Sequence, residues 1–487
     1  MNRKFHLIIV LLGICFITNA QLFRCIVATD GSGTHTTIQS ALDACPDGVQ
    51  SLIFIKNGTY SEQVTLGTKT VASTKKISLI GESATGVLIT HSQSRASSGS
   101  PTFEDICTVK IYATDFYAEN ISIQNAAGNT GMAEALYTAG DRQTFKNCRI
   151  LGYQDTYRSK KGARGYFKNC WLEGATDFIY AGGTLFFDDC TINCVNGGGY
   201  ISAPEDAFAT IPKASTVCAK FLRLEFIFRN CNITANPDVA ANTYTLGRPW
   251  NTTAGAFYLN CKLGSHIKSA GWTDMGGNST TACFAEYNSM DANGTPVDVS
   301  GRVSWSFQLP KADVDNLLTP AYVYAASYTT TYDPVSLCVS PVAPTNVKAI
   351  GNVISWEATS GVAGYMIYKD DKFLTAVTET SFTDNSGISG LYKVISVATT
   401  GVLSSAVAAI TALQPVIESS VNVIVTSEKI IFSEPVSYDV YNLTGKVVLS
   451  SKEYFTSIPV SNFSKGIYLL RMRDTNSKEK KIKINIR

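Results

Sequence analysis

The sequence predicts an all-β protein in which a parallel β-helix is followed by two small β-sandwich domains. Three observations lead to this prediction. A short sequence around cysteine recurs through the first domain, prolines separate the later segments, and those segments consist of short alternating apolar runs. The 487 residues, 45% of them hydrophobic, are enough for several domains with cores of their own. The formal charge of +2 gives no electrostatic reason to expect a nucleic-acid partner.

The chain begins with a segment typical of secretory signal peptides. Arg3 and Lys4 precede an apolar run that ends in small residues at Ala20. This run is shorter than the roughly 20 apolar residues that span a bilayer, and no later stretch is long and apolar enough to do so. We therefore expect residues 1–20 to be removed during export and the mature protein to have no membrane-spanning segment.

Five cysteines lie in one local context that repeats along residues 21–335. The tetrapeptides are FKNC twice, FDDC, FRNC and YLNC, and they end at Cys148, Cys170, Cys190, Cys231 and Cys261. The intervals of 22, 20, 41 and 30 residues indicate a unit of 20–22 residues with insertions. Short runs rich in Phe, Ile and Val make the elements of each unit strands. Such a repeat predicts one coil of a parallel β-helix per unit, whereas sandwich strands do not recur with one tetrapeptide at this length.

In this β-helix the repeated cysteine should point inward and stack on its equivalents, with the preceding asparagine forming a ladder. Disulfides among these cysteines stay open, because sequence does not fix connectivity. The segment TTIQSALDAC has apolar residues at helical spacing, from Ile38 to Cys45. It predicts a short helix that caps the open first coil.

Two carboxylates occupy the same position in consecutive coils. Asp155 follows Cys148 by seven residues, and Asp177 follows Cys170 by seven. Because adjacent parallel strands lie about 4.8 Å apart, we expect both side chains next to each other on one outer face. Two carboxylates that close do not both ionise easily, so one can serve as a general acid beside a nucleophile or base. A solvated aspartate pair and a Ca²⁺ site are the alternatives.

The segment LGRPW places Arg248 and Trp250 outside the repeat core. Arg248 can hold one aspartate ionised through a bidentate pair, and Trp250 offers a flat face to a sugar ring. The four histidines lie outside both aspartate segments, and no GxSxG, HExxH or P-loop pattern occurs. The sequence therefore argues against a Ser-His-Asp hydrolase and against a zinc enzyme.

At these residues the chain resembles the pectinesterases, the pectin methylesterase family of carbohydrate esterases. The match runs from about Phe23 to Tyr332 and includes, in order, VATDGSGTHTTIQSALDACPDG, NGTYSEQV, GYQDTY, DFIYAG, LGRPW and a Gly-Trp pair. The resemblance implies a right-handed parallel β-helix, methylated homogalacturonan (pectin) as substrate, methanol and de-esterified pectin as products, and neither cofactor nor metal. We expect a monomer.

The resemblance also implies a role for each site residue. Asp177 would attack the methyl-ester carbonyl to form an acyl-enzyme, and Asp155 would protonate departing methanol and then act as base on water. Arg248 would orient Asp177 and keep it charged, and Gln154 would donate to the oxyanion. The sugar-binding residues would be Trp250, Tyr180, Met275 and Met132.

One departure from the family pattern concerns the chemistry. Where the family has Gln-Ala-Val-Ala-Leu, this chain has MAEAL, with Met132 in place of a glutamine that helps to form the oxyanion hole. A thioether donates no hydrogen bond, and loss of one such donor costs about 10²–10³ in rate unless Glu134 or a backbone amide replaces it. The open alternatives to an exported pectin methylesterase are a β-helical pectate lyase or polygalacturonase and a non-catalytic pectin-binding protein. One phased aspartate pair with Arg248 favours the esterase.

Two further domains follow a proline-containing linker. Residues 343–414 contain VISWEA, GYMIYKD and YKVISVA, and Trp356 and Tyr392 suit the core of a sandwich that resembles a fibronectin type III domain. This domain could serve either as a ligand-binding module or as a spacer, and the sequence does not distinguish the two functions. Residues 418–487, with YNLTGK, KGIYLLRM and the basic end KEKKIKINIR, resemble the C-terminal sorting domain of type IX secretion. That resemblance implies the type IX machinery as partner, passage through the periplasm, and release or surface attachment.

Overall fold

The computed structural model describes residues 21–96, 99, 101–207, 209–212, 221–326, 328–386, 390–411 and 421–486. The predicted signal peptide lies outside these residues. The chain divides into two compact units. The first holds the described residues up to Thr345 with those of Trp356–Thr380 and Gly390–Ala408, and the second holds the described residues of Asn346–Ser355, Ser381–Ser389 and Ala409–Arg487.

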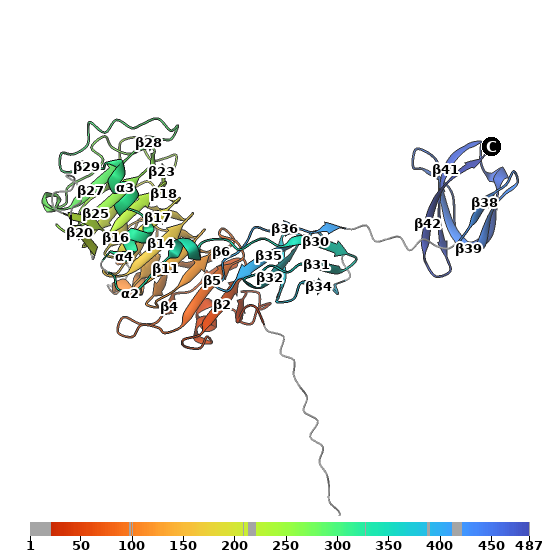
Figure 1. Cartoon of the computed structure of the whole chain (residues 1–487), viewed down its shortest axis with the longest axis horizontal. Coiled ribbons are helices and arrows are strands. Elements are labelled where there is room, and N and C mark those ends of the chain that lie inside the picture. The colour runs from red at the N-terminus through yellow and green to blue at the C-terminus, as the bar shows by residue number, and fades with distance from the viewer. Residues whose placement is uncertain are drawn as a thin grey trace, which may run out of the picture. The chain divides into compact units, whose positions relative to one another are not determined.

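Three parallel sheets, counted over the described residues, build most of the first unit and confirm the predicted parallel β-helix. Figure 1 shows strands of successive coils stacked side by side, such as β11, β14 and β17. Sheet 1 consists of β1 (Cys25–Val27), β2 (Gln50–Ile55), β5 (Lys76–Gly81), β8 (Tyr117–Glu119), β11 (Gln143–Lys146), β14 (Arg164–Lys168), β17 (Thr184–Asp188), β22 (Phe226–Arg229), β25 (Gly255–Leu259), β27 (Cys283–Tyr287) and β29 (Phe307–Gln308). Sheet 2 consists of β3 (Gly58–Ser61), β6 (Val87–His91), β9 (Ser122–Asn125), β12 (Arg149–Leu151), β15 (Trp171–Gly174), β18 (Thr191–Cys194), β23 (Asn232–Ala235), β26 (Lys262–Leu263) and β28 (Met290–Asp291). Sheet 3 consists of β4 (Val64–Leu66), β7 (Val109–Ile111), β10 (Leu136–Thr138), β13 (Tyr157–Ser159), β16 (Thr176–Ala181), β19 (Tyr200–Pro204) and β24 (Thr245–Gly247).

The sequence repeat becomes a stack inside the β-helix. The five repeated cysteines are buried with free thiols, so they serve packing rather than disulfide bonding. The aromatic residue of each repeat stacks as well, with neighbouring ring centroids 4.3 to 5.0 Å apart along Phe145, Phe167, Phe187, Phe228 and Tyr258. One residue per coil therefore fills the same place in a continuous core.

The residue before each repeated cysteine turns the chain between strands. Asn147, Asn169, Asp189, Asn230 and Asn260 all have φ between 50° and 55°. Asparagine and aspartate tolerate this left-handed region better than other residues with a Cβ. Side-chain amides connect two such positions to their equivalents in neighbouring coils, Asn147 to Asn120 at 2.5 Å and Asn288 to Asn260 at 2.9 Å. The predicted asparagine ladder is present at these coils.

Replacing Asn169 by alanine is expected to lower the free energy of unfolding by roughly 1–2 kcal/mol, because alanine is disfavoured at φ 54°. Asn169→Gly is the matched control, since glycine loses the same side chain yet adopts positive φ freely. Thermal unfolding of both variants measures the difference. Equal midpoints for the alanine and glycine variants would contradict this account of the turn.

Helix α1 (Ile38–Asp43) forms in the TTIQSALDAC segment, as predicted. The Thr37 hydroxyl caps it by accepting from the Ser40 backbone N–H. Ile38 and Leu42 are buried in the same core as β1, so the helix covers the first coil. The remaining helices of the described residues are α2 (Phe103–Ile106), α3 (Lys311–Leu317), α4 (Pro320–Ala325), α5 (Pro334–Leu337) and the 3₁₀ turns Asn278–Thr280 and Val460–Asn462.

The rest of the described chain forms further, mostly antiparallel sheets, as predicted for the C-terminal region. A two-stranded insertion in the first unit pairs β20 (Ala209–Pro212) with β21 (Phe221–Leu224). Sheet 4 has β30 (Thr345–Ile350), β31 (Val353–Glu357), β34 (Ser381–Thr383) and β37 (Ile410–Thr411). Sheet 5 has β32 (Val362–Lys369), β33 (Lys372–Val377), β35 (Tyr392–Ala398) and β36 (Val407–Ala408). Sheet 6 has β38 (Val423–Val425), β39 (Lys429–Tyr441), β40 (Val447–Pro459), β41 (Gly466–Asp474) and β42 (Glu479–Ile486).

Within the first unit, sheet 5 packs on the outside of sheet 1. The rings of Phe54 and Phe373 lie 4.3 Å apart, and Met366 joins the same buried cluster. Trp356 and Tyr392 are buried, as predicted for a sandwich core, while the resemblance to fibronectin type III stays a prediction. In the described ranges, no helix combines the length and apolar character needed to cross a membrane.

Candidate active site

Sheet 3 positions the two aspartates in consecutive coils. Asp177 belongs to β16, and Asp155 lies two residues before β13. Gln154 pairs in parallel with Thr176, so the residues that follow them occupy equivalent positions. The Asp155 backbone N–H also donates to the Thr176 carbonyl at 3.0 Å. The two aspartates are therefore neighbours across strands that lie about 4.8 Å apart.

Local backbone geometry directs both carboxylates. Asp155 has φ 60° and Asp177 has φ 47°, a region that aspartate tolerates. The pairing of β16 with β19 also shifts register between Thr176 and Ile179. Such irregularities re-aim side chains beside active sites. Both aspartates thus have a left-handed backbone conformation at the same point of their coils.

Both aspartates of the pair are buried, unlike ordinary surface aspartates. Asp155 is 4% exposed and Asp177 is 8% exposed, so the alternative of a solvated pair does not hold. Burial, followed by the charges of Asp177 and Glu134, raises the pKa of Asp155 to about 8. At pH 7 Asp155 therefore carries a proton, as a general acid must.

Arg248 pairs with only one of the two acids. Its Nε lies 3.0 Å from Oδ1 of Asp177 and its Nη2 lies 2.6 Å from Oδ2, which is the bidentate pair predicted for one of the acids. The guanidinium also lies 3.8 Å from the ring centroid of Tyr200, which supports it from β19. Asp177 is thus oriented and balanced by a positive charge, whereas Asp155 is not.

An exposed aromatic surface lies next to the acids. The rings of Tyr180 and Trp250 stack with centroids 5.5 Å apart; Trp250 is 40% exposed, whereas Tyr180 is only 2% exposed and supports Trp250 from the interior. Asn278 donates to the Trp250 carbonyl at 2.8 Å and so ties the loop that contains Met275 to this segment. The structure brings these three predicted sugar-binding residues into one region, with Tyr180 only three positions after Asp177.

Met132 is brought next to Gln154. These two residues form an isolated parallel bridge, and Gln154 forms the next one with Thr176. Three consecutive coils therefore stack a thioether, an amide and a hydroxyl side chain at the same level. Glu134 does not take over the missing donor, because its side chain is fully buried, accepts the Tyr180 hydroxyl and lies 2.8 Å from Arg158.

Sequence reasoning missed Arg158, Tyr200 and Tyr137 at this site. Arg158 stands three residues after Asp155, and its guanidinium stacks 3.8 Å from the ring of Tyr137. Tyr137, Arg158 and Tyr180 are register partners in three successive strands of sheet 3. Counting coil positions back from Tyr180 along the sequence would have grouped Arg158 and Tyr137 with it.

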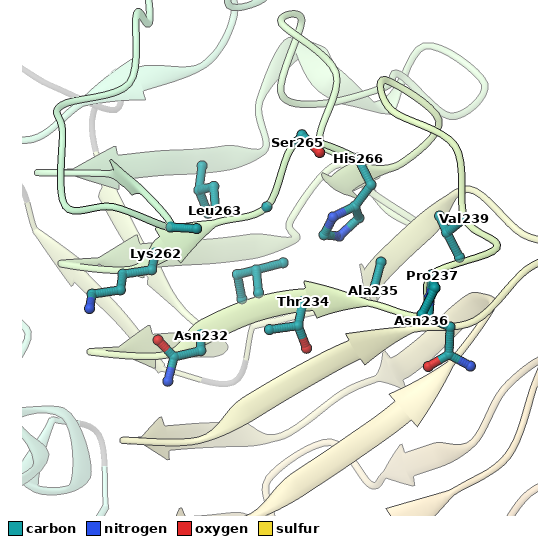
Figure 2. Close-up of a pocket in the computed structure, with 13 residues that line it drawn as sticks. Asn232, Thr234, Ala235, Asn236, Pro237, Val239, Lys262, Leu263, Ser265 and His266 are labelled. Atoms are coloured by element: carbon teal, nitrogen blue, oxygen red, sulfur yellow. The ribbon is translucent and has the colours of Figure 1, made fainter.

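A separate open pocket of about 560 Å³ lies over β23 and β26 of sheet 2 (Figure 2). Its lining includes Asn232, Thr234, Lys262 and His266. Among the described residues that line it there is no carboxylate and no predicted site residue. This pocket therefore lacks the carboxylates on which the predicted acid–base chemistry depends.

A parallel β-helix with a buried aspartate pair, one member of it paired with arginine, beside an exposed tryptophan fits the predicted class of β-helical enzymes that use carboxylate chemistry on carbohydrate. Comparison with known families makes this specific. Residues 24–322, more than half of the chain, match the Pectinesterase family, and the chain belongs to that family. Residues 419–486 match the Secretion system C-terminal sorting domain.

Individual relatives agree with this membership. A probable pectinesterase A from Neosartorya fischeri is 36% identical over 271 residues, which cover 54% of this chain and 77% of that protein. A pectin methylesterase from carrot has 27% identity and a TM-score of 0.54, covering 64% of this chain and 98% of its own. The pectin methylesterase of Erwinia chrysanthemi has 26% identity and a TM-score of 0.51, covering 64% and 99%.

The family establishes the class of enzyme, and the sorting domain indicates that the protein is exported or surface-bound. The chain is a carboxylic ester hydrolase of the pectinesterase family. The type IX sorting domain and the pectinesterase relatives indicate an exported or cell-surface protein. The lyase, polygalacturonase and non-catalytic alternatives are not favoured.

Proposed function

We propose that this chain is an exported pectin methylesterase that hydrolyses the galacturonate methyl esters of homogalacturonan to methanol and de-esterified pectin. The single observation that supports this mechanism best is the asymmetry of the buried acid pair. Arg248 holds Asp177 in two hydrogen bonds, while burial and its neighbours keep Asp155 protonated. An arginine-paired carboxyl group beside a protonated one supplies a nucleophile and a general acid.

In the first step, a carboxylate oxygen of Asp177 attacks the ester carbonyl carbon. The bond from that carbon to the methoxy oxygen breaks, and the proton of Asp155 moves to this oxygen, so that methanol leaves. Asp177 is then joined to the substrate as an acid anhydride, and Asp155 is ionised. The burial of both acids excludes bulk water from competing with this proton transfer.

In the second step, ionised Asp155 removes a proton from water as the water oxygen attacks the acyl carbon. The bond to Asp177 breaks, its carboxylate returns to Arg248, and the galacturonate product leaves with Asp155 protonated again. Gln154 would donate to the oxyanion in both steps. Trp250, Met275 and Met132 would contact the sugar chain, whereas the predicted contact of Tyr180 is corrected, because this ring is buried and instead supports Trp250.

Purified protein is expected to release methanol from highly methylated pectin without forming new reducing ends or unsaturated products. Because Asp155 must start protonated and its pKa is about 8, kcat/KM should fall about tenfold per pH unit above that value. A methanol assay from pH 5 to 10, with product analysis, tests both statements. Protein that binds pectin and releases no methanol at any pH would be a binding protein instead.

The remaining organisation follows from the same proposal. We place the mature enzyme domain at residues 21–335, a fibronectin type III-like domain at 343–414 and the sorting domain at 418–487. The predicted signal peptide and the matched sorting domain support passage through the periplasm to the type IX machinery. We propose that the enzyme acts as a monomer, because all the site residues named above come from one chain.

A further inference from the structure

Glu134 places a third carboxyl group near the aspartate pair. It stands where the family pattern has valine, and its side chain is fully buried. The next residue, Ala135, donates its backbone N–H to the carbonyl of Thr156 at 2.8 Å, so Glu134 lies one coil away from Asp155. A buried carboxyl group at such a place requires a partner, because burial of an unpaired charge is costly.

The partner of Glu134 is Arg158. Nε of Arg158 lies 2.8 Å from Oε1 of Glu134, the Tyr180 hydroxyl donates to the same oxygen, and Oε2 has no hydrogen-bond partner. Arg158 stands in β13, three residues after Asp155, and is fixed by stacking on Tyr137. Glu134, on the preceding coil, and Arg158, on the coil of Asp155 itself, therefore form an ion pair between these two coils, close to the general acid.

A charge count shows what this pair does. Glu134, Asp155 and Asp177 with Arg158 and Arg248 give a net charge of −1 when all five are ionised, and of zero when one proton is bound. Without Glu134, the other four groups are already neutral with no proton bound. Arg158 alone would thus favour loss of the proton from Asp155, since buried clusters favour net neutrality.

We propose that Glu134 is a positioning residue that keeps Asp155 protonated by cancelling the positive charge of Arg158. Its consequence for catalysis rests on the proposed function. The other titratable or charged groups around this pair are Glu104, Cys107, Lys110, Tyr112, Tyr137 and Tyr180. Burial raises the pKa of Cys107, Tyr112, Tyr137 and Tyr180, so they stay neutral. Glu104 is paired with Lys69 at 3.3 Å, and the Lys110 ammonium donates to the Glu104 backbone carbonyl at 2.8 Å. Burial raises the pKa of Glu134 itself to about 7, so Glu134 is ionised in the alkaline range where Asp155 titrates, and it is the carboxylate paired with Arg158.

Glu134→Gln and Arg158→Gln are expected to shift the alkaline limit of kcat/KM in opposite directions. The first variant leaves Arg158 unbalanced, so the limit should move down by about one pH unit, and the second should move it up by about one. Glutamine keeps an acceptor for Tyr180, so Glu134→Gln changes charge with little change of shape. The double variant should return close to the wild-type limit.

Glu286→Gln is the matched control. Glu286 lies in β27, away from the aspartate pair, and like Glu134 it is fully buried and close to an arginine, with its carboxylate 2.6 Å from Arg302. It should leave the pH limit in place. Shifts of both test variants in the same direction, or no shift in either, would overturn the proposal. If Glu134→Gln does not fold, Arg158→Gln alone decides, since an upward shift supports the proposal and its absence refutes it.

A readout without substrate separates this inference from the proposed function. Carboxyl ¹³C NMR of protein labelled at aspartate, assigned with Asp155→Asn, follows the titration of Asp155 directly. Opposite shifts in the two variants would support the role of Glu134 even if the wild-type protein released no methanol. An Asp155 titration that is unchanged in both, in protein that does release methanol, would leave the esterase proposal standing and remove this one.

Discussion

Asp177→Asn is expected to lower kcat for methanol release by about 10⁴-fold or more. An amide is not a nucleophile, so the acyl-enzyme cannot form, and the charge that Arg248 holds in two hydrogen bonds is lost. KM should change much less than kcat, because the bond from Asp177 to the carbonyl carbon develops only in the transition state. Initial rates of methanol release at pH 7 over a range of pectin concentrations measure both constants.

Asp188→Asn provides the matched control for this variant. Asp188 is 3% exposed and accepts from Nε and Nη2 of Arg229 at 2.9 and 2.8 Å. This is also a buried bidentate pair, but it lies in sheet 1 and not at the candidate site. Its loss should reduce stability but leave kcat per folded molecule near the wild-type value. An Asp177→Asn enzyme within tenfold of wild type would show that another group is the nucleophile. An equal loss in both variants would show that the pair matters for folding rather than for chemistry.

The coil repeat of the sequence was enough to predict that Asp155 and Asp177 are neighbours. The 22-residue interval between Asp155 and Asp177 is also the offset of the Gln154–Thr176 pairing. Residues one repeat apart in the sequence are therefore neighbours in the structure here. Arg248 follows Asp177 by 71 residues, across insertions between coils, and was found by its chemistry and its segment rather than by phase. Its pairing with Asp177 in place of Asp155 depends on side-chain directions that a repeat does not encode.

The Glu134–Arg158 pair shows why the rest could not be predicted. Met132 pairs with Gln154 at an offset of 22 residues, whereas Leu136 pairs with Tyr157 at 21. One residue of slippage exchanges the faces of a strand, so coil counting does not tell whether Glu134 points in or out. A glutamate is expected to be exposed, and the burial of Glu134 is explained only by its ion pair with Arg158 in the next coil. Likewise, the packing of sheet 5 on sheet 1 joins residues more than 300 positions apart, as in Phe54 and Phe373.

Met132→Gln is expected to raise kcat by about 10²-fold, with KM nearly unchanged. Met132 stacks on Gln154 in the neighbouring coil, so a glutamine there would place a second amide donor next to the first. One oxyanion donor is worth about 10²–10³ in rate, and its effect appears in kcat because the negative charge develops only in the transition state. Met132 is half-buried, and glutamine has nearly the same length, so the substitution should fit without rearrangement of the coil.

Met132→Leu is the matched control, since leucine is apolar, similar in volume and unable to donate, and it should stay within about threefold of wild type. The same methanol assay compares the three proteins at pH 7. A glutamine variant no faster than wild type would mean that another group already supplies the second hydrogen bond, and a backbone amide of the neighbouring coils would be the first to examine. If the leucine variant loses activity as well, Met132 contacts the sugar. The change shared by both variants would then be the loss of the thioether, not a change in hydrogen-bond donors.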